Sequence, residues 1–290
     1  MSFTEKRPKG LTRRNFIKGT AAGAVGGMVA GAAGTLLAAS PAPAAKEALC
    51  AELVKMRGHE GDMIDAYLAR PTGPDPYPGV VVIHHMPGWD EATKEITRKF
   101  AYHGYAAISP DLHFREGKGT PEANSASVAA AGGMPDNRTM GDVEGAIRQL
   151  RALPYVNGKV GIIGYCSGGR QVYLAACTLK GIDAAVACYP GGVAEGPARL
   201  NARQPVDPFD YTKDLSCPLL GLFGKEDKRP SPEHMAKTEA ELKKWGKTYE
   251  FHAYDKAAHA FFAVDRESYR PSAAVDGWKQ VFKWFEKYLR

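Results

Sequence analysis

The stretch GIIGYCSGGR (residues 161–170) ends an apolar run with a single cysteine set between glycines. Gly164, Cys166 and Gly168 fit a small-x-nucleophile-x-small turn between a strand and a helix. In such a turn a Cβ two residues before or after the centre collides with a neighbouring element, so glycine is needed there. The stretch therefore predicts a strand, a strained turn at Cys166 and a helix beginning near Gly168.

The turn determines what the thiol of Cys166 can do. It lifts the sulfur above the sheet and sets it at the start of a helix, where unpaired N–H groups and the dipole favour a thiolate. The alternative is a buried cysteine that acts as a small hydrophobe, the usual state of a free cysteine. Suitable partners elsewhere in the chain favour the reactive thiol.

An acid and a histidine follow the turn in the chain order that a nucleophile of this kind requires. Asp227 comes just after the strand expected at 218–224, and His259 comes just after the strand expected at 249–255. Both should share the carboxyl edge of the sheet with Cys166. We therefore expect a catalytic triad, in which the imidazole moves the proton and the carboxylate orients the imidazole.

Two backbone N–H groups are expected to stabilise the oxyanion of an acyl-transfer reaction. One belongs to Ser167, directly after the nucleophile, and the other to the loop HHMPGWD (84–90). Pro87 has no N–H, which leaves Met86 as the second donor. Ser167 is also the competing nucleophile, but it is off-centre in the turn.

Short β-rich runs alternate with helical patterns along the chain. The middle runs are continuously apolar, which is typical of parallel strands covered on both faces. This alternation predicts an α/β fold with a doubly wound, mostly parallel sheet and helices on both faces. Strands are expected at 79–85, 105–111, 159–165, 183–190, 218–224 and 249–255, with an antiparallel edge strand at 62–71. Helices are expected at 92–103, 139–153, 168–179, 232–245 and 273–289.

Two long segments rich in Gly, Pro and Ala interrupt this alternation, at 112–138 and 191–217. Both follow strands at the carboxyl edge of the sheet, where α/β proteins bind ligands. Long loops at that edge are either mobile surface or a lid, and we expect a lid over the site.

Composition and charge indicate one globular domain at 45–290 and exclude an electrostatic nucleic-acid binder. The chain has 290 residues, 44% of them hydrophobic and 24% charged. Residues 1–44 hold six basic residues and one acidic residue, so the remainder holds 32 basic and 31 acidic residues. A nearly neutral domain gives no reason to expect nucleic acid as a partner.

The first 44 residues resemble a bacterial twin-arginine export signal. TRRNFIK (12–18) precedes an uncharged Gly/Ala-rich run, and APA (42–44) offers a cleavage site before Ala45. The alternative is a transmembrane anchor, because the run exceeds 18 residues, but six glycines between positions 19 and 34 make it weakly apolar. We expect passage through the twin-arginine export machinery, a periplasmic or secreted protein, and no stable membrane anchor after cleavage.

The cysteines give no sign of a metal centre. The five are Cys50, Cys166, Cys177, Cys188 and Cys217. None has CxxC spacing, and no His/Cys cluster has the spacing of a zinc site. We therefore expect no metal and no cofactor. An odd number leaves at least one thiol unpaired unless it pairs between chains, and the pairing of the four outside the turn stays open.

Five stretches of the chain together resemble the dienelactone hydrolase family, which includes carboxymethylenebutenolidase. They are NGKVGIIGYCSGG, SPDLHFREG, GDVEGAIRQLRALPY, GKEDKRPSP and AAHAFF. The likeness covers nearly all of residues 55–289. It implies an α/β-hydrolase fold, metal-free hydrolysis of small esters or lactones, and the triad Cys166, Asp227 and His259.

The resemblance also implies two substrate-binding positions. Arg115 matches a family arginine that holds the substrate carboxylate, the alternative being an exposed loop arginine. His85 stands where relatives resembling the dienelactone enzyme carry a glutamate that helps to ionise the thiol. An imidazole cannot repeat the role of a carboxylate, although a nearby imidazolium would favour the thiolate electrostatically.

The leading hypothesis is an exported Cys-His-Asp hydrolase of small esters or lactones that acts through a thiol-acyl intermediate. One alternative is an esterase, thioesterase or peptidase that accepts a bulkier substrate beneath the 191–217 segment. A second alternative is a non-catalytic binding protein on the same fold.

Overall fold

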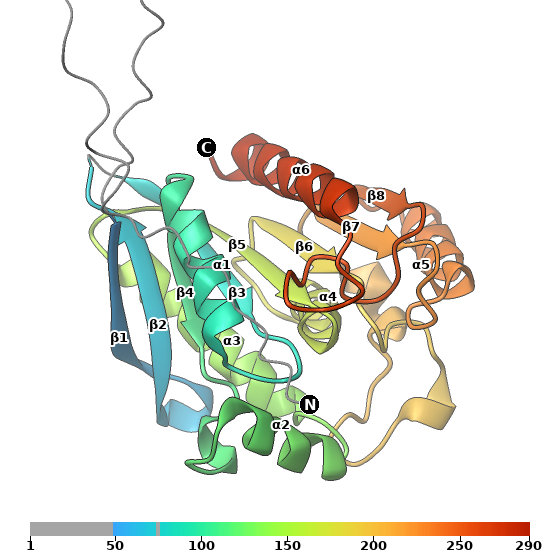
Figure 1. Cartoon of the computed structure of the whole chain (residues 1–290), viewed down its shortest axis with the longest axis horizontal. Helices are drawn as coiled ribbons and strands as arrows, with labels where there is room; N and C mark the ends of the chain where they lie inside the picture. Colours follow the sequence, from blue (N-terminus) through green and yellow to red (C-terminus); the bar gives the residue numbers. More distant parts are fainter. Residues whose placement is uncertain (1–48, 74–75) are drawn as a thin grey trace, which may run out of the picture. The chain divides into compact units, whose positions relative to one another are not determined.

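One eight-stranded sheet, in the order β1-β2-β4-β3-β5-β6-β7-β8, runs through the computed structural model of the chain, which describes residues 49–73 and 76–290 (Figure 1). β1 and β2 pair antiparallel, as do β2 and β4, and all other neighbouring strands pair parallel. The strands are β1 (Leu49–Arg57), β2 (Met63–Pro71), β3 (Tyr77–Ile83), β4 (Ala106–Pro110), β5 (Val156–Tyr165), β6 (Ala184–Cys188), β7 (Leu219–Gly224) and β8 (Tyr249–Tyr254). The architecture is that of an α/β hydrolase, as expected. The export signal, its cleavage site and the domain boundary at residue 45 lie outside the described residues.

The strand expected at 62–71 is antiparallel, but its placement at the sheet edge is wrong. β2 lies between β1 and β4, and β1 forms the edge. β1 was missed because its sequence, LCAELVKMR, carries charges along its length and is mostly solvent-accessible, with Leu53 67% exposed. A strand with so little burial has no clear apolar periodicity.

The helices confirm the expected pattern, with ends that differ by at most three residues. They are α1 (Glu91–Tyr102), α2 (Pro121–Ala130), α3 (Asp136–Ala152), α4 (Ser167–Thr178), α5 (Pro232–Lys244) and α6 (Pro271–Leu289). α2 was not predicted and lies inside the long segment 112–138. Thr120 caps α2 by accepting a hydrogen bond from the N–H of Ala123, and proline stands at the first helical position.

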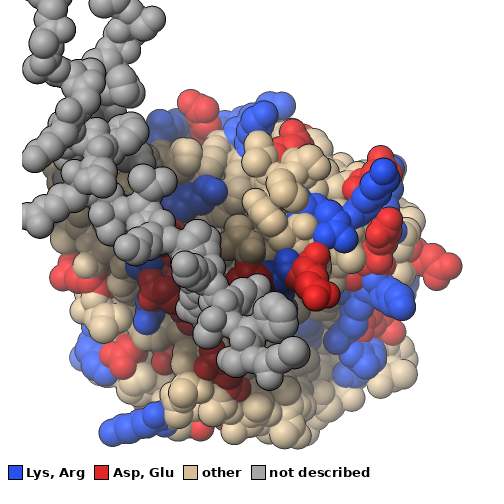
Figure 2. Space-filling model, viewed as in Figure 1, with Lys and Arg blue, Asp and Glu red and all other residues tan. Residues whose placement is uncertain are grey.

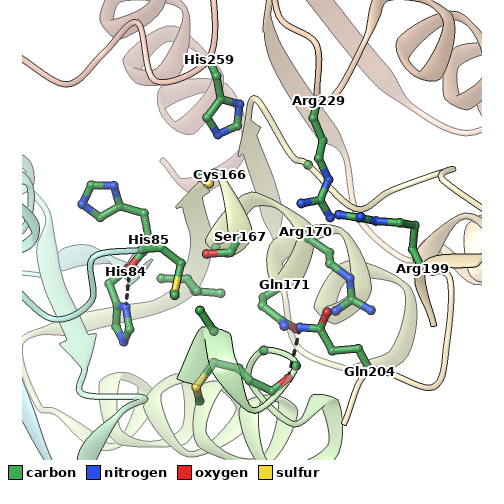
Figure 3. A pocket seen from close by; sticks show the side chains of 18 of the residues that line it. His84, His85, Cys166, Ser167, Arg170, Gln171, Arg199, Gln204, Arg229 and His259 are labelled. Atoms are coloured by element: carbon green, nitrogen blue, oxygen red, sulfur yellow. Dashed lines mark hydrogen bonds between the residues drawn. The ribbon is translucent and has the colours of Figure 1, made fainter. Parts of the chain in front are cut away.

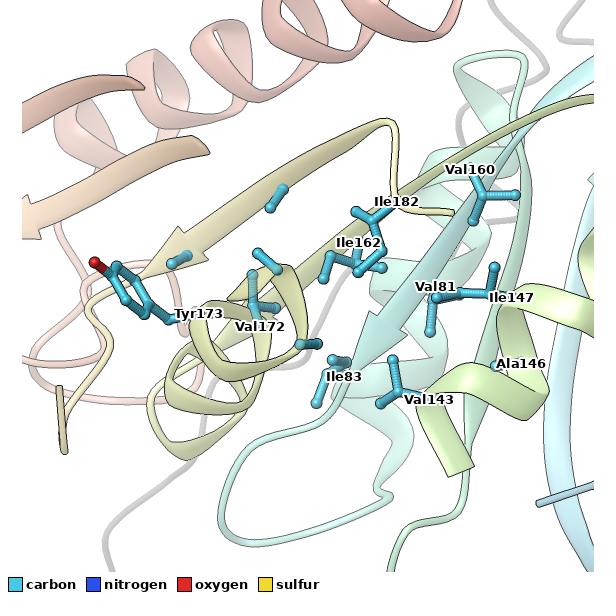
Figure 4. Packing of buried hydrophobic residues seen from close by; sticks show 14 of the residues in the cluster. Val81, Ile83, Val143, Ala146, Ile147, Val160, Ile162, Val172, Tyr173 and Ile182 are labelled. Carbon is cyan, nitrogen blue, oxygen red and sulfur yellow. The ribbon is translucent and has the colours of Figure 1, made fainter. Parts of the chain in front are cut away.

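Apolar side chains form a core on each face of the sheet. On one face, side chains of α3 and α4 cover β3 and β5, as Figure 4 shows for Val143, Ile147 and Val172. On the other face, Phe100 of α1 packs against Phe285 of α6. Each such fully buried side chain contributes about 1.5–3 kcal/mol. The two cores fix the sheet, and the sheet in turn fixes the loops at its carboxyl edge.

Four loops begin at the same edge because the central strands are parallel and nearly in register. Ile83 of β3 pairs with Gly164 of β5, and Tyr165 pairs with Cys188 of β6. Gly224, the last residue of β7, pairs with Tyr254, the last residue of β8. The loops that carry His85, Cys166, Asp227 and His259 therefore all leave from one rim of the sheet.

The surface seen in Figure 2 carries Lys and Arg interspersed with Asp and Glu, and no large area of one sign is visible on that face. This mixture agrees with the nearly balanced charge of the chain outside residues 1–44. Within the described residues, no helix combines the length and apolar character needed to cross a bilayer.

Candidate active site

The turn at Cys166 has the strained geometry that the sequence predicts. Cys166 lies between the last residue of β5 and the first residue of α4, with φ 55° and ψ −120°. A Cβ on Gly168 would lie 2.5 Å from the carbonyl oxygen of Ile83, and a Cβ on Gly164 would collide with the carbonyl oxygen of Gly168. Only glycine fits at both positions, so the backbone itself forces the sulfur out above the sheet.

Asp227 and His259 are brought together by the loops after β7 and β8. The Nδ1 atom of His259 lies 2.8 Å from Oδ2 of Asp227, whose side chain is almost fully buried. These loops are joined by the Glu226 N–H, which donates to the Ala257 carbonyl at 2.9 Å. With Nδ1 facing the carboxylate, the other ring nitrogen of His259 is left for the sulfur.

Cys166 and His259 shift each other's pKa in opposite directions. Burial would raise the pKa of the Cys166 thiol, but the hydrogen bond with His259, its positive charge, the N–H of Ser167 and the charge of Arg229 lower it below the ordinary value. Burial would lower the pKa of His259, but hydrogen bonds with Asp227 and Cys166 raise it to about 9. The pair therefore favours a thiolate beside an imidazolium.

The loop after β3 carries His84, His85 and Met86, the last of which is the expected second oxyanion donor. Met86 lines the cavity above Cys166, and within the described residues its N–H has no hydrogen-bond acceptor. Arg266 donates to the Met86 carbonyl at 3.3 Å, and Ser125 contacts the Met86 sulfur at 3.1 Å. Ser167 and Met86 both line the cavity, and the role of their N–H groups toward an oxyanion stays a prediction.

His85 also lines this cavity, and its partner is an acid. Its Nε2 lies 3.4 Å from Oδ2 of Asp90. Burial would raise the pKa of Asp90, but the hydrogen bond from His85 and those from Thr93 lower it to about 2. His85 is therefore tied to the N-cap residue of α1.

A cavity of about 840 Å³ opens next to the sulfur (Figure 3). Both long Gly/Pro/Ala-rich segments contribute to its wall, as expected for a lid. They also bind each other, because Asn201 donates to the Gly132 carbonyl and Gln204 to the Met134 carbonyl. A cavity of this size accommodates a ligand much larger than a simple lactone.

Sequence reasoning missed several side chains near the sulfur. Arg170, Arg199 and Arg229 line the cavity, and the ring of Tyr189 packs edge-on against His259 at 5.1 Å between centroids. Arg229 had a sequence signal, since it comes two residues after Asp227 in the same loop. Tyr189 had one too, because it directly follows β6 at the same rim. Arg199 had none within its long segment.

Residues 64–289 match the dienelactone hydrolase family. The chain belongs to that family. It is therefore a hydrolase of carboxylic ester or lactone bonds, and the non-catalytic alternative is not supported.

Relatives of the dienelactone hydrolase type match most of their own length. The chain is similar to a candidate carboxymethylenebutenolidase of Methylorubrum extorquens AM1, with 33% identity over 83% of this chain and 82% of the relative. A candidate carboxymethylenebutenolidase of Escherichia coli K12 is 34% identical over 79% of this chain and 84% of the relative. The crystal structure of a candidate dienelactone hydrolase from Klebsiella pneumoniae superposes with a TM-score of 0.75 and 30% identity, covering 83% of this chain and all of that one.

Arg115, at the family arginine position, does not line the cavity. Its Nε lies 2.8 Å from Asp62, and its two terminal nitrogens lie 2.9 and 3.1 Å from the carboxylate of Asp142. Asp142 is fully buried, so it needs this cation as a partner. Arg115 therefore belongs to an ion-pair cluster with Asp62 and Asp142, and its expected contact with a substrate carboxylate stays a prediction.

The other four cysteines differ from Cys166 in their surroundings. All five cysteines lie in the described residues, and none is in a disulfide. Within residues 49–73 and 76–290, no group of three or more His, Cys, Asp or Glu side chains has metal-binding geometry. Burial raises the pKa of the Cys188 thiol, in contrast to Cys166. Cys166 thus differs from the buried Cys188 because His259 and its other partners lower its pKa.

Proposed function

We propose that the chain hydrolyses small carboxylic esters or lactones with Cys166 as the nucleophile. The observation that carries this proposal is the chain of contacts from Cys166 to His259 to Asp227 on a strained strand-to-helix turn. That arrangement supplies a thiolate, a proton carrier and a group that orients it.

The reaction begins when the Cys166 thiolate attacks the carbonyl carbon and forms a C–S bond. The carbonyl oxygen gains the negative charge, and the N–H groups of Met86 and Ser167 donate hydrogen bonds to it. The tetrahedral intermediate then collapses, the C–O bond to the alcohol breaks, and the His259 imidazolium gives its proton to the departing alkoxide. With a lactone, that alcohol stays attached to the acyl group.

Hydrolysis of the thiol-acyl intermediate restores the site. Neutral His259 takes a proton from water, the resulting hydroxide attacks the thioester carbonyl, and the C–S bond breaks to release a carboxylic acid and the thiolate. Asp227 keeps the imidazole in the required orientation in both halves. Protons and charges balance, because His259 begins and ends each turnover protonated.

Turnover of p-nitrophenyl acetate and of a panel of lactones tests this function. The wild-type protein should hydrolyse at least one of them, and mass spectrometry of a rapidly quenched reaction should find an acyl group on the peptide containing Cys166. Cys166→Ala should lose activity by about four orders of magnitude. Unchanged turnover by this variant would falsify the assignment of the nucleophile.

A second candidate function is hydrolysis of a bulkier ester, thioester or peptide beneath the 191–217 segment. The cavity volume of about 840 Å³ favours it, as does the contribution of both long segments to the cavity wall. A series of p-nitrophenyl esters with acyl chains of two to twelve carbons separates the two. An optimum at the shortest chain supports the small substrate, and an optimum at a longer chain supports the bulkier one.

We further infer that the protein is exported through the twin-arginine pathway. The support is in the sequence: TRRNFIK at 12–18, the uncharged run after it and the small residues at 42–44. Mass spectrometry of the protein from a periplasmic fraction should find Ala45 at the N-terminus. Replacing Arg13 and Arg14 with lysine should leave the protein in the cytoplasm, and export of that variant would contradict the proposal.

A further inference from the structure

One carboxylate holds two arginines at the wall of the cavity. Nε of Arg229 lies 2.6 Å from Oε1 of Glu195, and Nε of Arg199 lies 3.0 Å from Oε2 of the same side chain. Glu195 is 7% exposed and also accepts the N–H of Gly192 at 2.8 Å. The three side chains together carry one positive charge in excess.

The terminal nitrogens of both guanidiniums are available to a ligand. Each arginine uses only its Nε toward Glu195, and within residues 49–73 and 76–290 those terminal nitrogens have no acceptor. Both side chains are 53% exposed and both line the cavity. The neighbouring N–H groups of two guanidiniums form a donor set that matches the oxygens of a carboxylate.

The other charged groups of the cavity do not pair with these two arginines. They are Glu226, Asp227, Lys228, Arg170 and the Cys166–His259 pair. Arg170 is bound to Asp136. Asp227 is bound to His259, whose imidazolium also interacts with the Cys166 thiolate, so the negative charge of this group lies at the sulfur. Glu226 and Lys228 carry opposite charges. The free positive charge at the wall therefore belongs to Arg199 and Arg229.

The arginine pair lies across the sulfur from the expected oxyanion loop. In Figure 3, His85 lies on one side of Cys166, and Arg229 and Arg199 lie on the other. A carbonyl oxygen directed at Met86 and Ser167 would thus leave the rest of the substrate pointing toward the arginines. Arg229 is close enough for its charge to act on the thiol.

We propose that Arg199 and Arg229 form a carboxylate-binding subsite that selects extended anionic esters, in which the carboxylate is separated from the scissile carbonyl by a chain of several atoms. The inference rests on the proposed function, because it assigns the substrate class of the same site. It differs from the expectation for Arg115, each of whose three nitrogens already donates to Asp62 or Asp142. The size of the cavity leaves room for the spacer.

Two p-nitrophenyl esters of equal chain length test the subsite: the hexanoate, which is neutral, and the mono-ester of adipic acid, which ends in a carboxylate. The measured quantity is the ratio of kcat/KM for the adipate ester to that for the hexanoate ester. We expect a wild-type ratio of about ten or more, because a charge-assisted hydrogen-bonded contact contributes about a tenfold effect. Arg229→Gln and Arg199→Gln should each lower this ratio about tenfold, and Arg229→Lys should lower it less.

The matched control is Lys225→Gln, which removes one positive charge from the same loop as Arg229. Lys225 is paired with Asp255 and does not line the cavity. The ratio of kcat/KM for the adipate ester to that for the hexanoate ester should be the same in Lys225→Gln as in the wild type. Equal losses in the Lys225 and Arg229 variants would mean that net charge alone is responsible, and would overturn the subsite.

Alkylation of Cys166 gives a readout that does not need turnover. Iodoacetate carries a carboxylate and iodoacetamide does not, so the ratio of their rates at Cys166 reports the attraction of an anion into the cavity. Arg229→Gln and Arg199→Gln should lower that ratio, and Lys225→Gln should not. A wild-type ester ratio at or below one, or ratios that the arginine variants leave unchanged, overturns the inference. Activity that survives Cys166→Ala instead overturns the proposed function.

Discussion

Arg115 binds Asp142 through both terminal nitrogens of its guanidinium, at 2.9 and 3.1 Å. The Asp142 side chain has no exposed surface and also accepts the backbone N–H of His59 at 2.8 Å. Arg115 in turn is anchored to Asp62. This cluster ties the loop after β4 to α3 and to the turn between β1 and β2, which gives Arg115 a structural role.

Arg115→Ala is expected to destabilise the protein by about 3 kcal/mol, because it leaves the buried Asp142 carboxylate without its cation. Urea denaturation gives the free energy of unfolding. The matched control is Arg148→Ala, which removes the exposed ion-pair partner of Glu144. Both residues lie on α3, the helix that carries Asp142, and this variant should lose no more than about 0.5 kcal/mol. An Arg115 variant with unchanged stability and a raised KM for anionic esters would instead support the substrate-binding expectation.

The thiol of Cys166 should react at lower pH than an ordinary cysteine. The hydrogen bond and charge of His259 outweigh the effect of burial on the Cys166 pKa. The rate of iodoacetamide labelling at Cys166, followed by mass spectrometry over pH 5–10, should therefore level off at lower pH than that of glutathione. In the His259→Gln variant, burial still raises the Cys166 pKa, but the histidine that lowers it is gone. The labelling profile of that variant should therefore move to higher pH. Coincident profiles for the two proteins would exclude the ion pair.

The His259–Asp227 contact should stabilise the fold most at low pH. An unfolded histidine titrates near 6.5, whereas His259 in the folded protein titrates at about 9. Below pH 6.5 both states are protonated and the stabilisation is complete. As pH rises through 9 the folded protein also loses the proton, and the stabilisation is lost.

The measurement compares the free energies of unfolding of Cys166→Ala and of the double variant Cys166→Ala/His259→Gln at pH 6 and pH 10. The alanine background is needed because the Cys166 thiol also contributes a pH-dependent stabilisation. Its pKa is lowered in the folded protein, so that contribution is present above the pKa of the unfolded thiol and is lost as pH falls through the pKa of the folded thiol. The difference between the two proteins should be larger at pH 6. Because the alanine background also removes the contribution of Cys166 to the His259 pKa, a larger difference at pH 10 would contradict the raising of that pKa by Asp227.

Gly168→Ala should damage both stability and activity. The added Cβ would lie 2.5 Å from the Ile83 carbonyl oxygen and 2.6 Å from that of His84, and backbone cannot move aside as a side chain can. We expect a loss of about 2 kcal/mol and about 6 °C in Tm. Turnover should also fall, because the strain falls on the loop that carries Met86. Gly119→Ala is the control, since its Cβ would meet side chains and no backbone, the end of Asn124 at 2.9 Å and the Cβ of Ala123 at 3.3 Å, and it should leave Tm nearly unchanged.

Local patterns were enough to predict the sheet and the strained turn at Cys166, whereas the catalytic triad stays a prediction. The glycines around Cys166 reveal a steric requirement within five residues, and Asp227 and His259 each come within five residues of the end of a strand. The edge strand β1 could not be recognised in the same way, because one edge is unpaired and its exposed side chains blur the alternation.

Ion pairs between distant segments could not be read from the sequence. Arg115 is separated by 27 residues from Asp142, and Arg229 by 34 residues from Glu195. Nothing in the local sequence distinguishes an arginine that faces a ligand from one that neutralises a buried acid. Only the folded arrangement separates the engaged donors of Arg115 from the available terminal nitrogens of Arg199 and Arg229.

The left-handed backbone at Cys166 is fixed by main-chain atoms alone. The Cys166 N–H donates to the Cys188 carbonyl at 3.0 Å, and carbonyl oxygens crowd Gly164 and Gly168 on either side. No contact that sets this conformation involves sulfur. The same backbone would hold the hydroxyl oxygen of a serine in the position of the sulfur. The single substitution Cys166→Ser would therefore exchange the attacking atom while the surrounding main chain stays as it is.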